Sequence, residues 1–198
     1  MAISMKPIER KTITFTIKGI SPLIQHKWSE KAKREMREKH AGKKTKSREV
    51  RNPEKEFQEA CYLTDEGEYG IPLMAFKNSL ITAAHKDIGI EKTLVRKAFF
   101  IKSEDSNLIN KIECSEPVMR EDMVRVGAGS ADMRYRPEFR QWSTTITAEI
   151  DSQLLTVDDV VNLINRAGFG VGIGEWRPEK NGEYGRFEVD TTQPVNVV

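Results

Sequence analysis

Arginine and aromatic side chains alternate in the segment from Asp132 to Arg140, which reads DMRYRPEFR. If this segment is extended, alternate side chains point to opposite faces, with the arginines on one face and the aromatic rings on the other. Guanidinium groups make planar, bidentate contacts with phosphate, and aromatic rings stack on bases. The pattern therefore favours a ribbon that binds single-stranded nucleic acid through Arg134, Tyr135, Arg136, Phe139 and Arg140.

The same segment has a purely structural interpretation. In it, the segment is an edge hairpin whose arginines pair with Asp132, Glu138 and Glu121. Under either interpretation Pro137 favours an edge or protruding strand, because proline cannot donate a hydrogen bond to a central ladder.

Positive charge is concentrated in one part of the chain. Residues 26–51 hold eleven Lys or Arg against four Glu, so this window carries +7 and leaves −5 for the rest of a chain whose net charge is +2. Such asymmetry is typical of an arm that binds a polyanion, whereas a solvated helix face is the alternative. The predicted contacts in this arm are His26, Lys27, Lys43, Lys44, Lys46 and Arg48.

Glycines recur at Gly168, Gly170, Gly172 and Gly174, and Trp176 and Arg177 follow them. Glycine is costly to order, so such a run indicates positive φ or a close approach to the backbone. One interpretation is a loop that contacts the ligand through Gly170, Gly172, Gly174, Trp176 and Arg177. The other is a helix C-cap at Gly168 followed by tight packing against a neighbouring strand.

Neither of the common nucleotide-binding glycine loops fits the sequence. A dinucleotide fingerprint follows a strand and opens a helix, whereas this run follows a helical pattern and leads into a strand. A P-loop needs a glycine five residues before Gly42, and Arg37 occupies that position.

Length and composition place limits on the class of protein. At 198 residues, 38% hydrophobic and 31% charged, the chain is long enough for one well-formed core with a charged surface. No apolar run approaches a membrane span and the N-terminus has no apolar signal core, so we expect a cytoplasmic protein without membrane contact. Cys61 and Cys114 are isolated and the three histidines lack metal spacing, which predicts reduced thiols, no metal and no cofactor.

The elements that would position these residues can be read along the chain. Period-two alternation predicts strands at 12–17 and 143–150, and helical spacing predicts helices at 30–39, 73–86 and from a Thr156 cap to Gly168. Less regular apolar segments predict strands at 94–101, 111–114, 123–126 and 185–190, with turns at 65–70 and 105–107. The strand at 123–126 is the predicted partner of the strand at 111–114. Residues 41–52 are too polar to bury a face, and 193–198 form a tail that docking would order.

The resulting order of strand, helix, strand, strand, helix and strand is that of a ferredoxin-like, RRM-like split βαβ fold. It belongs to the α+β class, with two helices covering one face of an antiparallel sheet and the other face available for binding. We expect one domain, 1–198, with a basic insertion at about 26–55 and a ribbon or hairpin insertion at about 120–142.

With this order the chain resembles the repeat-associated RNA-binding (RAMP) superfamily, in particular the guide-RNA-binding backbone subunits of CRISPR effector complexes. The resemblance lies in Ile20 to Leu23 after the first strand, Ile71 to Leu80 entering a helix, and Gly168 to Gly174. The chain is also similar to uncharacterised phage-encoded proteins in Val124 to Gly127, Arg136-Pro137 and Gly185 to Val189. In the superfamily the glycine-rich loop and protruding insertions handle RNA, which implies the same roles for the arm, ribbon and loop described above. The chain is smaller than typical backbone subunits, a departure that places membership of a complete CRISPR complex in question.

Some relatives in the superfamily cleave RNA with a general acid-base histidine, which makes His26 and His85 candidates, with Tyr69 or Lys86 as helpers. A histidine in a basic loop is also an ordinary phosphate or base contact, and a histidine at a helix end favours the helix dipole. The sequence has no paired-carboxylate nuclease motif, no G-x-S-x-G and no reactive-cysteine constellation. We therefore expect a protein that is not an enzyme.

The main hypothesis is a non-catalytic binder of single-stranded RNA or DNA that assembles side by side along its ligand as a homo-oligomer or filament. A protein-interaction or anti-defence protein that uses the same surface is the first alternative. A metal-independent endoribonuclease is the second.

Overall fold

An antiparallel sheet forms the centre of the molecule in a computed structural model that describes residues 6–42, 50–126 and 129–198. Its main strands lie in the order β10 (Phe187–Val189), β1 (Arg10–Gly19), β9 (Trp142–Asp151) and β4 (Phe99–Lys102). In chain order these are the fourth, first, third and second strands of the core. That arrangement is the ferredoxin-like one, so the predicted α+β fold class is confirmed.

The alternation of residue types in β1 sets which face of the sheet is buried. Ile13, Phe15 and Ile17 are buried, and β1 pairs with β9 along its length, so that Phe15 lies opposite Ile146. The threonines between them lie on the opposite face, where Thr14 and Thr16 share hydrogen bonds of 3.0 and 2.9 Å with Thr147 and Thr145. The strands predicted at 12–17 and 143–150 are therefore confirmed.

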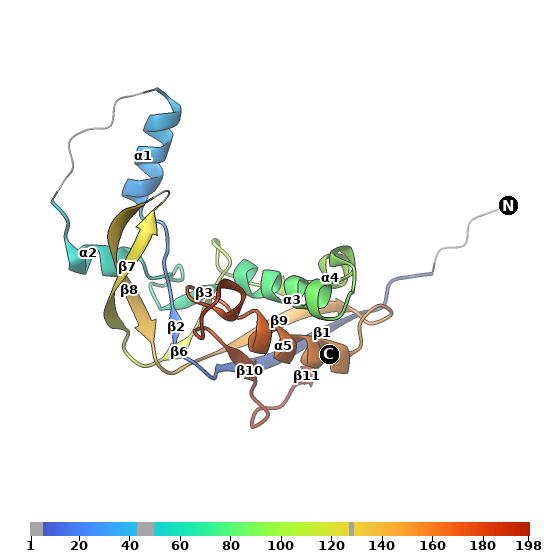
Figure 1. Cartoon of the computed structure of the whole chain (residues 1–198). Helices are drawn as coiled ribbons and strands as arrows, with labels where there is room; N and C mark the ends of the chain where they lie inside the picture. The colour runs from blue at the N-terminus through green and yellow to red at the C-terminus, as the bar shows by residue number, and fades with distance from the viewer. Residues whose placement is uncertain (1–5, 43–49, 127–128) are drawn as a thin grey trace.

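Two helices, α3 (Leu73–Asp87) and α5 (Val157–Gly170), cover the apolar face of the sheet (Figure 1). α5 begins with a reciprocal capping box in which Thr156 Oγ1 accepts from the Asp159 amide at 3.1 Å and Asp159 accepts from the Thr156 amide at 2.9 Å. Their apolar stripes meet the sheet in one core that includes Phe76 and Ile164. Both helices were predicted from the sequence.

The segment predicted as a strand at 94–101 is wrong in its first half. Residues Lys92–Ala98 form the helix α4, and only Phe99–Lys102 form β4. Val95 and Ala98 are buried at helical spacing, three residues apart. A short apolar run fits the period of a strand and that of a helix equally well. Here the run forms a helix that packs beside α3.

The predicted pairing of 111–114 with 123–126 is also wrong. β5 (Ile109–Lys111) pairs with β3 (Gly70–Pro72), and β6 (Glu113–Cys114) pairs with β9. β7 (Val118–Val126) instead pairs with β8 (Ser130–Phe139) as a hairpin. The C-terminal tail docks as predicted, because β11 (Asn196–Val197) pairs with the edge of β1.

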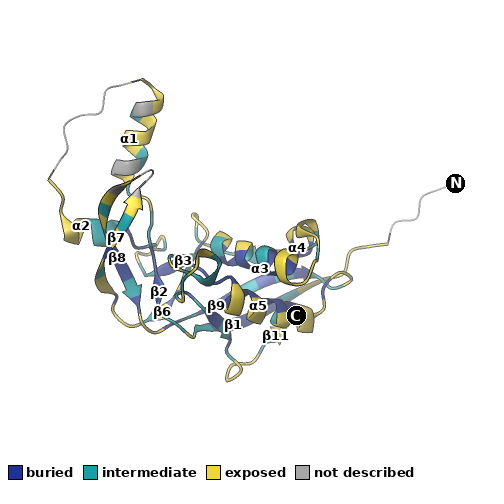
Figure 2. Cartoon of the chain, viewed as in Figure 1, coloured by how far each residue is buried: buried dark blue, intermediate teal, exposed yellow. Residues whose placement is uncertain are grey.

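A second sheet, in the order β2–β8–β7, lies at one end of the molecule (Figure 1). Its strand β2 (Leu23–Ile24) follows β1, and the helices α1 (Glu30–His40) and α2 (Pro53–Glu59) come next in the chain. We call β2, α1, α2, β7 and β8 together the hairpin lobe. Most of the described residues of α1 are exposed, so this helix projects from the lobe (Figure 2).

Two glycines near the end of α5 provide a matched test of packing. A Cβ at Gly168 would overlap the Phe187 carbonyl on β10, whereas a Cβ at Gly170 would meet only the Asp87 carboxylate, at 3.6 Å. Gly168→Ala should destabilise the fold by about 1–3 kcal/mol through overpacking. Gly170→Ala should change stability by less than about 1 kcal/mol. Urea unfolding of both variants measures this, and equal effects would contradict the packing.

Candidate functional site

A cleft of 410 Å³ lies in the hairpin lobe between the loop after β2, the helices α1 and α2, and the strand β8. It brings together residues more than one hundred positions apart in the sequence. Its lining comes from His26, Lys27, Trp28, Ser29, Met36, Glu56, Ala60, Arg134 and Tyr135. Four of the predicted ligand contacts, His26, Lys27, Arg134 and Tyr135, therefore share one concave surface.

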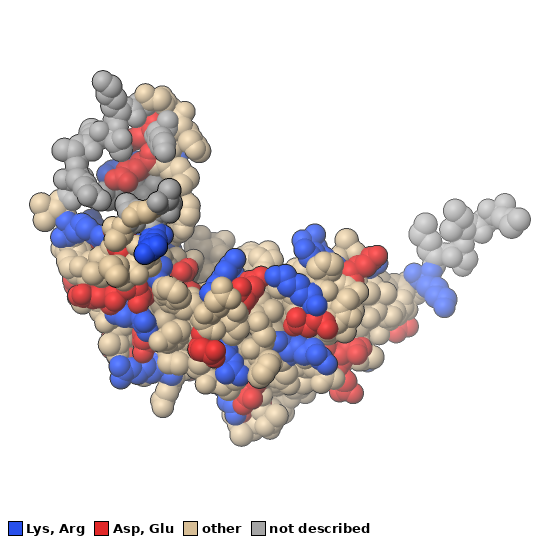
Figure 3. Space-filling view, in the orientation of Figure 1, with Lys and Arg blue, Asp and Glu red and all other residues tan. Residues whose placement is uncertain are grey.

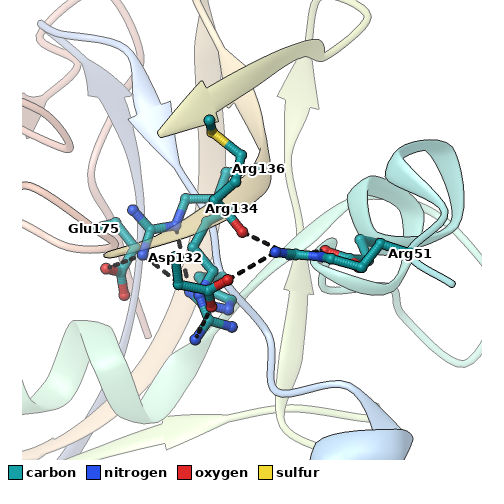
Figure 4. A network of polar contacts seen from close by, with 8 residues as sticks. Arg51, Asp132, Arg134, Arg136 and Glu175 are labelled. Carbon is teal, nitrogen blue, oxygen red and sulfur yellow. Dashed lines mark hydrogen bonds and ion pairs between the residues drawn. The ribbon is translucent and has the colours of Figure 1, made fainter. Parts of the chain in front are cut away.

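Arg136 is not on that surface, which corrects one sequence-based prediction. Its side chain is buried, and its guanidinium group lies 3.3 Å from Asp122 on β7 and 3.2 Å from Glu175 (Figure 4). A buried guanidinium group with two carboxylate partners has its charge compensated within the protein. Arg136 therefore organises the lobe and has no donor directed to solvent for a phosphate.

Arg136 also determines the state of His26. Its Nη2 donates to His26 Nδ1 at 3.1 Å, and a guanidinium group cannot accept a hydrogen bond. Nδ1 must then be the acceptor, so the ring is neutral and carries its proton on Nε2. Burial, and then the charge of Arg136, lower the pKa of His26, against a weaker opposing effect of Glu175.

Arg51, which lies just before α2, connects that helix to the first part of β8. It pairs with Glu56, lies 2.7 Å from Asp132, and its guanidinium carbon is 5.6 Å from the centre of the Tyr135 ring. Asp132 also pairs with Arg134 at 3.0 Å (Figure 4). Tyr135 is therefore held beside the cleft by a cation–π contact that the sequence analysis did not identify.

Phe139 and Pro137 are corrections of a different kind. Phe139 is fully buried and its ring packs edge-on against Tyr69, with centroids 5.3 Å apart, so it cannot stack on a base. Pro137 lies in a central strand, because β8 pairs with β7 on one side and with β2 on the other, where the Pro137 carbonyl accepts from Gln25 at 3.1 Å. Arg140 follows the strand, is 67% exposed and pairs with Glu138 at 3.3 Å.

Arg120 is a charged residue of the lobe that the sequence analysis missed. It lies 3.0 Å from Asp122 and 2.6 Å from Glu138, and its guanidinium group stacks 4.9 Å from the centre of the Tyr184 ring. The available signal was the occurrence of both signs of charge within 118–126, at Arg120, Glu121, Asp122 and Arg125. Arg120 and Arg136 share Asp122, so they form one ionic network in which Arg136 and Asp122 are buried and Arg120 is partly exposed.

The glycine run approaches the protein's own backbone. Gly172 and Gly174 have φ of 70° and 79°, and a Cβ at Gly174 would overlap the carbonyl of Ile24 in β2. The helix continues to Gly170, so the C-cap proposed at Gly168 is wrong, although the tight packing proposed with it is present. The close approach that demands glycine is thus made by β2.

The two residues after the run have different surroundings. Trp176 has φ of 53° and is partly exposed. Arg177 donates to the Gly174 carbonyl at 3.0 Å and pairs with Glu179 at 2.9 Å. Arg177 therefore stabilises the turn that follows the glycines.

The remaining predictions concern the arm and the catalytic candidates. Lys43, Lys44, Lys46 and Arg48 lie outside the described residues. Lys86 pairs with Glu179 at 3.3 Å, and Tyr69 packs on Phe139, so both proposed helpers are engaged elsewhere. His26 Nδ1 is occupied by Arg136, which leaves Nε2–H as a donor and no free base on that ring.

No helix in 6–42, 50–126 or 129–198 is both long and apolar enough to span a bilayer. Within the same ranges no group of three or more His, Cys, Asp or Glu is arranged to hold a metal ion.

The fold and site define an α+β ferredoxin-like protein with a charged hairpin lobe. The sequence matches no family model and no curated protein. The structure is similar to a chain of the Type III-B Cmr-beta bound to cognate target RNA, with a TM-score of 0.52, 7% identity and 96% of this chain covered. This chain spans 61% of the length of that relative. Cmr6 from Pyrococcus furiosus gives a TM-score of 0.45 at 11% identity, covering 92% of this chain and 98% of that one.

At such identity, the similarity to Cmr-beta shows a shared fold. The resemblance to CRISPR effector subunits that the sequence indicated is confirmed at this level.

The ionic network predicts that replacing Arg136 in β8 destabilises the fold more than replacing Arg140, which follows the end of that strand. Arg136→Met leaves Asp122 and Glu175 without a shared partner and should cost about 3 kcal/mol of unfolding free energy. Arg140→Met removes only an exposed pair and should cost less than about 0.5 kcal/mol. Denaturant unfolding at pH 7.5 measures both. Similar values for the two would show that Arg136 does not hold the lobe together.

The lowered pKa of His26 predicts a loss of stability in mild acid. The unfolded chain binds a proton near the usual value of 6.5, whereas the folded state accepts it only at lower pH. The contribution is thus fully present above pH 6.5 and is lost as pH falls through the folded pKa. We expect wild type to lose more stability between pH 7.5 and 5 than His26→Gln, whose amide oxygen can still accept from Arg136. Parallel pH profiles would contradict a neutral His26.

Proposed function

We propose that this protein binds single-stranded nucleic acid without cleaving it, through the cleft of the hairpin lobe and the basic arm of residues 26–51. The observation that carries the proposal is the meeting of cationic and aromatic side chains, Lys27 and Arg134 with Trp28 and Tyr135, on one concave surface. Cations provide affinity for phosphates, and exposed rings provide platforms for bases.

The distribution of paired and unpaired cations supports this proposal. Lys27 and Arg125 form no ion pair with any residue in the described ranges, and the arm contributes Lys43, Lys44, Lys46 and Arg48 nearby in the sequence. On the face shown in Figure 3, acidic and basic side chains are otherwise intermixed. Lys92, Arg96 and Lys97 of α4 also form no ion pair among the described residues, so what distinguishes the lobe is that its cations lie beside the aromatic rings of one cleft.

Among nucleic acids we favour RNA as the ligand, and we propose side-by-side assembly along it on the basis of the sequence resemblance alone. The relative with a TM-score of 0.52 is a chain of Cmr-beta bound to cognate target RNA. A fold alone does not fix function, so the argument remains with the site. On the face of the sheet opposite the helices, the hydroxyls of Thr14 and Thr16 pair with those of Thr147 and Thr145, and Lys102 donates to Thr12.

The protein-interaction alternative uses the same surface. A protein complex that survives nuclease treatment and is indifferent to charge reversal in 43–48 would favour it. The endoribonuclease alternative is weakened by the engagement of His26 Nδ1, and RNA that stays intact after long incubation would count further against it.

Charge reversal provides the main test. Fluorescence anisotropy should show binding of mixed-sequence RNA and DNA 20-mers that weakens about 100-fold between 50 and 200 mM salt, if about five phosphates are contacted. Lys43→Glu with Lys44→Glu should lower the affinity at least tenfold. The matched control, Lys92→Glu with Lys97→Glu on α4, reverses two charges at the end of the molecule remote from the lobe (Figure 1) and should leave it nearly unchanged.

Two outcomes would contradict the proposal. One is the absence of binding to either nucleic acid at 50 mM salt. The other is an equal loss in both double variants, which would indicate only a general charge effect.

A further inference from the structure

Phosphate contacts leave the aromatic part of the cleft unexplained. Trp28 is 56% exposed and Met36 is 43% exposed, yet both line the same concave surface as Tyr135. Phosphates gain little from such side chains, whereas the face of a base stacks on them. At 410 Å³ the cleft also lies within the usual range for sites that enclose a small planar ligand.

The hydrogen bonds of the lobe determine which polar groups of the cleft can donate. His26 can only donate from Nε2, because its Nδ1 is occupied by Arg136. Lys27 and Arg134 are donors by nature. The one carboxylate in the lining, Glu56, accepts from Arg51 through both of its oxygens, at 2.8 Å for Oε1. His26, Lys27 and Arg134 therefore present donors to the cleft, beside the hydroxyl groups of Ser29 and Tyr135, which can donate or accept.

We propose that the cleft binds one unstacked base that presents two adjacent acceptors, as the N7 and O6 edge of guanine does. This inference rests on the nucleic-acid binding proposed above and names the base that the site selects. Adenine pairs its N7 acceptor with an amino donor on the same edge, and that donor would face the donors of the cleft. Discrimination would come from the unpaired donors and not from the phosphates.

Arg136 acts here as a positioning residue. It does not touch the base, but it holds His26 in the tautomer that directs Nε2–H away from the buried network. The pair links the base site to Asp122 and Glu175, and thus to the fold of the lobe.

Binding of substituted oligonucleotides tests the base site separately from phosphate binding. The probes are uridine 12-mers whose central residue is uridine, guanosine, 7-deazaguanosine or adenosine, with a matching set of thymidine-based DNA probes. The guanosine probe should bind about tenfold more tightly than the adenosine and 7-deazaguanosine probes, since 7-deazaguanosine lacks only the N7 acceptor. Trp28→Ala and His26→Phe, which removes the Nε2–H donor and keeps a planar ring, should each reduce this ratio to near one.

The control is Phe169→Ala, which removes a 71%-exposed aromatic ring from α5 instead of the lobe and should preserve the ratio. Thermal unfolding verifies that each variant remains folded. Equal affinity of wild type for all four probes overturns the base site, while salt-dependent binding of the all-uridine probe leaves the proposed function intact. Absence of binding to any RNA or DNA probe overturns both.

Discussion

The buried guanidinium group of Arg136 is the constraint on which the hairpin lobe depends. A charge removed from water must find compensating partners within hydrogen-bonding distance. Its partners come from separate parts of the chain: Asp122 on β7, Glu175 after the glycine run, and His26 after β2. One side chain thus ties the hairpin, the glycine loop and the first loop together. The glycine loop can approach because Gly174 has no side chain to collide with Ile24.

The sequence predicted the ferredoxin-like order because β1, β9, α3 and α5 each repeat their own period over many residues. The alternation of residue types in 132–140 also predicted an extended segment, and β8 is extended there as far as Phe139. The sequence could not show which cations are neutralised, because Asp122 and Glu175 lie 14 and 39 positions from Arg136. Nor could it show that Phe139 is covered, since that follows from its packing in the core and against Tyr69.

The glycine run illustrates the same division between local and tertiary information. Positive φ at Gly172 and Gly174 agrees with what repeated glycine indicates about the backbone. The identity of the neighbouring group was open, and both a ligand and another segment satisfied the pattern. In the structure the neighbours are Ile24, and Pro178 at 2.8 Å from a Cβ built at Gly172. Glycine spacing specifies room for an approach, and only the fold specifies what approaches.

The separation of buried from exposed cations would allow a chain of net charge +2 to present the polyanion site that we propose. Arg120 and Arg136 form ion pairs within the network that shapes the lobe, and Arg177 forms one that stabilises a turn. Where charges are intermixed, as on the face in Figure 3, their fields largely cancel beyond a Debye length. Recognition must then depend on short-range contacts where free cations and exposed rings coincide. Lys27, which has no ion pair among the described residues, and Trp28, which is 56% exposed, meet that requirement in one cleft with Arg134 and Tyr135. The site, and not the overall charge, therefore supports the proposed function.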